Sequence, residues 1–346
     1  MIWKKKQFWG TIVAIALLVF CIKEITLSEL KSLYYRVDII YVILALLTSA
    51  LFIAFKALRW KLIIAPQKKI SVYRSVTLYS AGQVLNILMP ALTGQLGRMF
   101  LFAKKEGLSK TFVFSTFVLE ILFDSITLVL FLLLISLAFV FPDEYRSLGW
   151  IVAIVALVLL AGLYVFLHYH QSLEAFSYQH LRARRPGLYI GMRKFIRSFS
   201  KGIKLLRSSQ HLAGSLSISL VFWSAHMLVV FFLFKAFGFE LPLAAAATVM
   251  IVNTLALIIP ITPGNVGTFE IAVSTSLAAF SVNRSDAVMF ALAMHLLDII
   301  PMWIFGAAFL RSDKVSIREI EKEHEDEKLL DHLSEESVLV DQEKLA

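Results

Sequence analysis

Eight apolar stretches with few charged residues alternate along the chain with shorter polar connections. They lie at about 8–22, 38–58, 75–103, 111–141, 149–168, 212–235, 241–282 and 285–310. A helix needs about 20 apolar residues to cross the roughly 30 Å of hydrocarbon in a bilayer, and most of these stretches reach that length. They also lack the polar face that a helix on the surface of a soluble core carries. The pattern predicts an all-α polytopic membrane protein.

Composition agrees with this interpretation, because 58% of the 346 residues are hydrophobic and only 17% are charged, far from the proportions of a soluble domain. Cys21 is the only cysteine in the sequence, which excludes an internal disulfide and a metal site of four cysteines. The N-terminal segment resembles a signal peptide but lacks small residues at a cleavage position, so we expect a retained first helix. His295 and Asp298 lack further metal ligands at suitable spacing. We expect neither a metal nor a cofactor.

Basic residues gather in connections that we place on the cytoplasmic side of the membrane. They precede the first stretch at Lys4–Lys6, follow the second from Lys56 and Arg59 to Arg74, and follow the third. Nine more accompany a single acid in 171–210. The connections poor in Lys and Arg lie around 23–37, 142–148, 236–240 and 283–286. We therefore expect a multi-pass protein of the cytoplasmic membrane with both termini in the cytoplasm.

The basic connection contains an amphipathic stretch at 192–209. One helical face would carry Phe195, Phe199, Ile203 and Leu206, opposite Arg and Lys. Such a helix is typical of the surface of an anionic leaflet, which we expect as a partner; a plain solvated linker is the alternative. Nucleic-acid binding is not expected, because the basic residues lie beside membrane spans.

Two of the apolar stretches, 75–103 and 241–282, are each broken in the middle by Pro and Gly. Both breaks follow the spacing P-x-x-x-G-x-x-G, with Pro90, Gly94 and Gly97 in the first and Pro260, Gly264 and Gly267 in the second. The charge distribution requires each stretch to enter and leave on the same side, either as a re-entrant hairpin or as paired crossings. The first enters from the cytoplasm and the second from outside. This arrangement predicts an inverted repeat, a common plan of secondary transporters.

The chain divides accordingly into a membrane domain at 1–310 and an acidic tail at 311–346. The repeat halves lie at about 38–168 and 212–310, and the basic linker 171–210 joins them. Twelve of the 25 acidic residues lie in the tail, which we expect to be cytoplasmic and solvated.

Helix breaks inside a membrane leave backbone groups that need partners. In broken helices these groups are offered to a polar substrate, so we interpret the break at 260–267 as one wall of an aqueous cavity. The alternative is a tight turn that permits close packing of helices.

Four ionisable residues are predicted to lie near mid-membrane. Glu120 and Asp124 follow the first break and His295 and Asp298 follow the second; each pair shares a helical face. Counted from opposite sides of the membrane, all four lie roughly 14–20 Å deep. Ionisable groups at that depth usually face a polar interior, so we expect them to line one polar cavity with Arg98. The alternative is that these acids pair with Arg98, Arg59 or His295 and so lock helices together.

Four strings of the sequence resemble, in the right order, motifs of the transmembrane flippase domain of lysylphosphatidylglycerol synthases. These strings are "ALRWKLII" (57–64), "NILMPALTGQLGR" (86–98), "LEILFD" (119–124) and "PGNVGTFE" (263–270). The resemblance covers nearly the whole span 10–310. That family carries a soluble aminoacyltransferase domain after the membrane region, where this chain has the acidic tail. The resemblance therefore implies a stand-alone member that does not perform the synthase reaction.

The resemblance also implies a set of substrate-binding residues. The matching positions are Asn86, Pro90, Gly94, Arg98, Glu120 and Asp124 in the first half and Pro263, Gly264, Gly267 and Glu270 in the second. At five motif positions the residue differs from the one that the family usually or often has: Leu92, Gln95, Ile121, Asn265 and His295. We include Gln95, Asn265 and His295, together with Gly97 and Asp298, among the candidate substrate-binding residues.

The leading hypothesis is a lipid flippase that moves a polar head group while the acyl chains stay in the bilayer. Nothing in the sequence resembles an ATPase, so transport would be passive or ion-coupled. The sequence contains no nucleophile elbow, phosphate-binding loop or zinc-helix motif, which favours a transporter over an enzyme. The alternatives are an integral-membrane enzyme acting on a lipid-linked sugar and a non-catalytic partner of a lipid-synthesis enzyme. A homo-oligomer stays open.

Overall fold

The computed structural model describes residues 2–23, 25–88, 92–138, 146–181, 186–203, 208–257 and 262–313. Within these ranges the regular elements are helices, and no strand occurs. The helices are α1 (Ile2–Ile22), α2 (Leu27–Arg36), α3 (Ile39–Ile64), α4 (Val72–Leu88), α5 (Leu92–Glu106), α6 (Lys110–Ala138), α7 (Arg146–Leu181), α8 (Pro186–Ile203), α9 (Ser209–Ala236), α10 (Leu243–Ala256), α11 (Thr268–Ala278) and α12 (Arg284–Asp313), with a short 3-10 turn, η3 (Pro263–Asn265).

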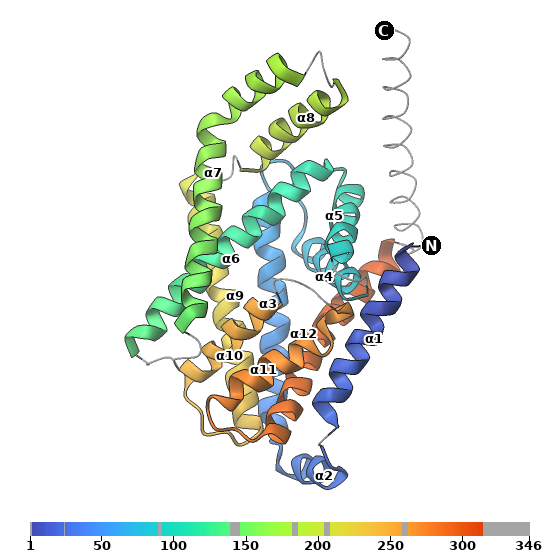
Figure 1. Ribbon diagram of the computed structural model, residues 1–346, viewed down its shortest axis with the longest axis vertical. Helices are drawn as coiled ribbons and strands as arrows, with labels where there is room; N and C mark the ends of the chain where they lie inside the picture. The colour runs from blue at the N-terminus through green and yellow to red at the C-terminus, as the bar shows by residue number, and fades with distance from the viewer. Residues whose placement is uncertain are drawn as a thin grey trace.

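Four of the described helices are long and apolar enough to cross a bilayer: α3, α6, α9 and α12. Shorter apolar helices lie at 12–22 in α1 and over α10. The protein is an all-α polytopic membrane protein, as the hydropathy pattern predicts. Figure 1 shows the long helices running along the length of the molecule, with α2 at one end and α8 at the other.

The core lies between α3 and α9, which pack along each other, and it extends to α10, α11 and α12. Large buried side chains fill it, among them Phe222, Phe234 and Phe290, each fully buried. Small residues on α10, from Ala245 to Ala247, allow that helix to approach closely, as small residues do between membrane helices.

Both broken stretches fold into two packed arms. Helices α4 and α5 form an antiparallel pair: a Cβ at Gly94 would lie 2.7 Å from Asn86 Cα, and one at Gly82 would lie 2.8 Å from Arg98 Cγ. Helices α10 and α11 also pack against each other. The four arms have 17, 15, 14 and 11 residues, fewer than the about 20 that a crossing requires. These lengths favour re-entrant hairpins over paired crossings.

The second break lies against the first hairpin. A Cβ at Gly264 would lie 3.1 Å from Ile87 Cγ2, near the end of α4. On α12, a Cβ at Gly306 would lie 3.2 Å from the backbone nitrogen of Ala81. The second break therefore contacts the end of α4, although the two are far apart in the sequence.

One local prediction is wrong. Helix α3 continues to Ile64, so Lys56 and Arg59 lie inside a membrane-spanning helix and not in a cytoplasmic connection. The connection at 23–37, which is poor in Lys and Arg, contains a helix, α2. An amphipathic helix, α8, covers 186–203, and the rest of the predicted stretch lies partly outside the described residues; Ile196 and Phe199 of α8 are buried against α6 and α7. Phe199 packs with apolar side chains of α3 and α6, which explains why protein covers part of the predicted lipid-facing surface.

Candidate functional site

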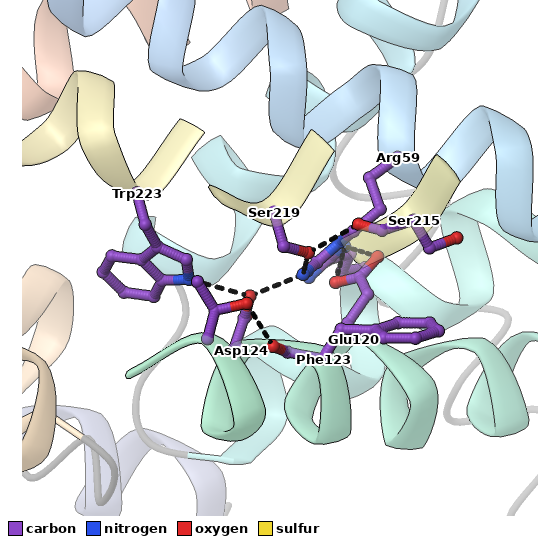
Figure 2. A network of polar contacts seen from close by, with 9 residues as sticks. Arg59, Glu120, Phe123, Asp124, Ser215, Ser219 and Trp223 are labelled. Carbon is purple, nitrogen blue, oxygen red and sulfur yellow. Dashed lines mark hydrogen bonds and ion pairs between the residues drawn. The ribbon is translucent and has the colours of Figure 1, made fainter. Parts of the chain in front are cut away.

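A buried ion pair between α3 and α6 is the centre of the candidate site. Arg59 is fully buried and donates from Nη1 to Asp124 Oδ1 at 2.6 Å and to Ser219 Oγ on α9 at 2.9 Å. Trp223 Nε1, one turn further along α9, donates to the same carboxylate oxygen at 3.2 Å. Figure 2 shows Asp124 between Trp223 and Arg59. These contacts join the two predicted halves, because α9 lies in the predicted second half.

Lys56 lies one turn before Arg59 on the same face of α3. Its Nζ lies over three aromatic rings, 5.0 Å from the centroid of Phe52 and 5.5 Å from those of Phe222 and Trp223. The ammonium is stabilised by the negative faces of these rings. Among the described residues, no carboxylate lies within ion-pair distance of it.

A second buried pair joins α5 to α6. Arg98 Nη2 donates to both carboxylate oxygens of Glu120, at 3.0 and 2.9 Å, and both side chains are almost fully buried. The guanidinium also lies 4.4–5.1 Å from three ring centroids, those of Tyr79, Phe102 and Phe117. The pair thus fixes the second arm of the first hairpin to a membrane-spanning helix.

The two pairs and Lys56 form one electrostatic cluster. Lys56 interacts with the charges of Asp124, Arg59, Glu120 and Arg98. The five groups carry three positive and two negative charges. The cluster therefore has one cation more than its carboxylates balance, and that cation is Lys56.

A further carboxylate, that of Asp298 on α12, lies next to a histidine of α9. Asp298 Oδ2 is 3.4 Å from His226 Nε2 on α9, within ion-pair distance but without hydrogen-bond geometry. The ring of His226 stacks on Phe52 with centroids 4.4 Å apart. Phe52 therefore contacts both Lys56 and His226, and it links the first pair to Asp298.

A third contact fixes the second break. His295 on α12 places Nδ1 2.7 Å from Glu270 Oε1 and Nε2 3.0 Å from the carbonyl oxygen of Gly264. The other oxygen of Glu270 accepts the Gly267 N–H at 2.6 Å, at the start of α11. Phe269 stacks on the imidazole, with centroids 4.2 Å apart and rings 7° from parallel.

The contacts repeat between the halves. In the first half, Arg59 on the first span contacts Asp124 on the span after the hairpin; in the second, His226 on α9 contacts Asp298 on α12. The second arm of each hairpin also contacts that later span, through the pairs Arg98–Glu120 and Glu270–His295. The contact pattern therefore supports the repeat that the sequence spacing predicts.

Glycines at the breaks pack against protein. A Cβ at Gly267 would lie 2.3 Å from Leu17 Cβ on α1, and one at Gly94 would lie 2.7 Å from Asn86. Gly264 and Gly267 also have positive φ, 61° and 86°, which favours glycine. At Gly94 and Gly267 the structure therefore agrees with the close-packing alternative, and a head group would need these contacts to open.

The remaining candidate residues lie close to the breaks. Asn86 is near the end of α4, with Oδ1 buried and unpaired among the described atoms. Gln95 is half-buried and Gly97 is buried on α5. Pro263 begins η3, and Asn265 ends it with φ 58°. Pro90 and Pro260 lie outside the described residues.

The predicted central charges separate into two groups. Glu120 and Asp124 pair with Arg98 and Arg59, and Asp298 lies beside His226, which stacks on Phe52. His295 instead pairs with Glu270 beside the second break. Polar pockets of about 530 Å³ between α7 and α8 and about 430 Å³ between α2 and the start of α12 occur among the described residues. Figure 1 shows that α8 and α2 lie toward opposite ends of the molecule. Neither pocket is lined by these four residues, so their shared cavity stays a prediction.

Sequence reasoning did not include Lys56, Arg59, Ser219, Trp223 and His226 among the candidate site residues. Lys56 and Arg59 were detectable, because the apolar pattern continues beyond them to Ile64. Ser219, Trp223 and His226 lie at spacings of three to four residues on α9, which places them on one face, but this spacing does not identify their partners.

Comparisons with known proteins place this geometry in a family. The family model for the lysylphosphatidylglycerol synthase TM region matches residues 7–306. A UPF0104 membrane protein of Pyrococcus horikoshii is 22% identical over 338 residues, covering 90% of this chain and 99% of the relative. UPF0104 membrane proteins of Methanothermobacter thermautotrophicus and Methanocaldococcus jannaschii are each 23% identical, covering 75% and 77% of this chain and 80% and 82% of the relatives.

No solved structure matches the chain. The family match extends from the first helix to the last span, so it includes both hairpins and every charged pair described above. The protein belongs to the family of the lysylphosphatidylglycerol synthase transmembrane region.

Proposed function

We propose that this protein is a lipid flippase that moves a polar, phosphate-bearing head group across the cytoplasmic membrane. The observation that carries the proposal is the incomplete hydrogen bonding of Arg59. Its Nη1 is engaged, but Nε and Nη2 are buried without a partner among the described residues. Unsatisfied donors of a buried charged group are costly, and a phosphate has the acceptor oxygens that would complete them.

Lys56 supports the same substrate class. It is the unbalanced cation of the cluster, its side chain is partly exposed, and it lies one turn from Arg59. An ammonium and a guanidinium on one helix face can bind the same phosphate. The aromatic rings around Lys56 would replace part of its hydration, so a head group could interact with it away from bulk water.

The two broken hairpins support a transport function. Broken helices that meet between repeat halves are typical of secondary transporters, in which one half moves against the other. Here the second break touches the end of α4, and charged pairs hold each hairpin to a membrane-spanning helix. The acyl chains would stay in the bilayer while the head group passes between the halves.

The proposal is tested by reconstitution into liposomes that contain phospholipid with a fluorescent acyl chain. Transfer between leaflets is followed by chemical quenching from outside. Lys56→Met should slow transfer about 10- to 150-fold, because a hydrogen bond to a charged group contributes about 1.5–3 kcal/mol. Lys61→Met, on the same helix and outside the cluster, is the matched control and should retain the wild-type rate.

A labelled glycolipid without phosphate serves as the second probe, and it should move more slowly than the phospholipid. Equal transfer of phospholipid by wild type, Lys56→Met and empty liposomes would contradict a flippase. Adding a nucleotide sugar separates the rival enzyme: formation of a new glycolipid without transfer would support an enzyme acting on a lipid-linked sugar.

A further inference from the structure

The Glu270–His295 contact has an unusual arrangement of hydrogen-bond donors and acceptors. The carbonyl oxygen of Gly264 can only accept, so Nε2 of His295 must carry a hydrogen to bond it at 3.0 Å. The second ring nitrogen, Nδ1, lies 2.7 Å from Glu270 Oε1. A neutral ring protonated at Nε2 has a lone pair at Nδ1, which would face an ionised carboxylate and repel it.

One additional proton removes this conflict. It lies between Nδ1 and Oε1, either as imidazolium with carboxylate or as neutral imidazole with carboxylic acid. In both forms the pair is neutral overall and every contact is a hydrogen bond. Without the proton, the pair carries one negative charge in a largely buried place, where an isolated charge is costly. The geometry therefore describes the proton-bound state.

Loss of that proton must break a contact that fixes the second break. Either Nε2 gives up its hydrogen and releases the Gly264 carbonyl, or Nδ1 and Glu270 separate. Glu270 also accepts the N–H of Gly267, so its movement would free the start of α11. Gly264 lies against Ile87 of the first hairpin, so release would act at the contact between the two breaks.

The elements on either side of the second break contribute few other titratable groups. Helix α10 and η3 contribute no titratable side chain, and α11 contributes Glu270 alone. The other elements packed around the pair carry further titratable or charged groups, among them Cys21 on α1, Lys56 and Arg59 on α3, Arg74 and Tyr79 on α4, His226 on α9, and Arg284 and Asp298 on α12. Cys21 interacts electrostatically with Glu270, and Asp298 lies beside His226.

A comparison of the two predicted halves gives a second, independent reason to expect a proton-binding site in the second half. The corresponding contacts in the first half use Arg59 and Arg98, whose guanidinium groups stay charged at every physiological pH. The second half uses His226 and His295, and an imidazole can bind or release a proton where a guanidinium cannot. Protons can therefore alter the second half while the first stays fixed.

We infer that Glu270 and His295 form one proton-binding site, and that the proton bound there couples movement of the second hairpin to a proton gradient. The proton leaves to water when the contact opens and is taken up again when it closes. Coupling to lipid movement rests on the proposed function, whereas binding of the proton by the pair does not.

Hydrogen exchange over 262–270 in the purified full chain tests the proton site without any transport assay. With intrinsic exchange rates taken into account, protection should fall at least about tenfold between pH 6 and pH 9 in wild type. Glu270→Gln keeps an acceptor for Gly267 and supplies an amide donor to Nδ1, so it imitates the proton-bound pair and should keep its protection throughout. Glu240→Gln, at an exposed carboxylate, is the control and should behave as wild type.

The same variants are then compared in liposomes with a pH difference across the membrane. One pH unit can drive up to about a tenfold ratio of labelled lipid between leaflets if one proton moves with each lipid. Glu270→Gln should show no such ratio. Should Glu270→Gln fail to fold, His295→Gln, which also removes the shared proton, replaces it in both assays.

The outcomes separate the two claims. Equal pH dependence of protection in wild type and Glu270→Gln would overturn the proton site. pH-dependent protection in wild type, abolished by Glu270→Gln, supports the proton site even if no lipid moves, and in that case only the flippase proposal fails. A lipid distribution that does not depend on the pH difference across the membrane would overturn the coupling between proton and lipid movement.

Discussion

Glu120→Gln should destabilise the protein strongly, because it leaves the guanidinium of Arg98 buried without its counter-charge. Both side chains are less than one-tenth exposed, and the pair makes two charge-assisted hydrogen bonds. Removing one partner of a buried ion pair costs about 3–5 kcal/mol. The amide introduced by Glu120→Gln would retain an acceptor oxygen, but its nitrogen would lie near a cation that it cannot neutralise.

The charge of the whole cluster predicts that the two single variants differ. With Glu120 neutral, Lys56, Arg59 and Arg98 would face Asp124 alone. With Arg98→Met, two cations would face two carboxylates, so this variant should lose less stability than Glu120→Gln. The double variant Arg98→Met/Glu120→Leu should recover most of the loss, since an apolar pair of similar volume is often neutral relative to a buried ion pair.

The buried thiol of Cys21 provides the assay. As the only cysteine in the sequence, it reacts with a thiol-specific fluorescent dye only when α1 separates from the protein, and circular dichroism at 222 nm reports helix loss in parallel. If Glu120→Gln unfolds at the wild-type temperature, or if the double variant is no more stable than Glu120→Gln, then Arg98 and Glu120 do not act as a structural pair.

Two further predictions concern packing and topology. Gly267→Ala should lower stability by about 1–3 kcal/mol, because the residue has φ 86° and its Cβ would overlap Leu17. The control Gly162→Ala, in open space on α7, should leave the unfolding temperature unchanged or raised. Equal effects of the two variants in a thermal melt would contradict this reasoning. In a Cys21→Ser background, Glu240→Cys should react with an impermeant thiol reagent from outside and Gln67→Cys should not; the opposite result in whole cells would overturn the assigned orientation.

The sequence predicts the architecture well where the physics is local. Apolar runs identify the long helices, because a helix that crosses the bilayer must be apolar along its length. Pro and Gly mark the breaks, because they interrupt the helical hydrogen bonds that a membrane segment needs. The spacing of Pro90, Gly94 and Gly97 against Pro260, Gly264 and Gly267 predicts a repeat, and the paired contacts of α3–α6 and α9–α12 support it.

The sequence does not determine which ionisable side chains pair with one another. The sequence alone allows Asp298 to pair with His295, three residues away on the same face, yet it lies beside His226 on α9, while His295 turns to Glu270. Lys56 and Arg59 look like flanking bases until the helix is known to reach Ile64. Which side chains meet depends on how far each helix is rotated about its own axis. That rotation is determined by packing between segments far apart in the sequence, such as α3 and α9.

The proposed proton site would let the predicted repeat hold charges in a membrane and still move. If both halves used arginine, every pair would keep its charge, and separating the halves would always leave buried ions exposed to hydrocarbon. If both used histidine, the charges would depend on pH on either side of the membrane at once. The pairs of the first half contain Arg59 and Arg98, whereas those of the second half contain His226 and His295, so under the proposed proton site only the second half has contacts that depend on protons. Because the second break rests on α4, a change in the second half reaches the first hairpin directly, through Gly264 and Ile87.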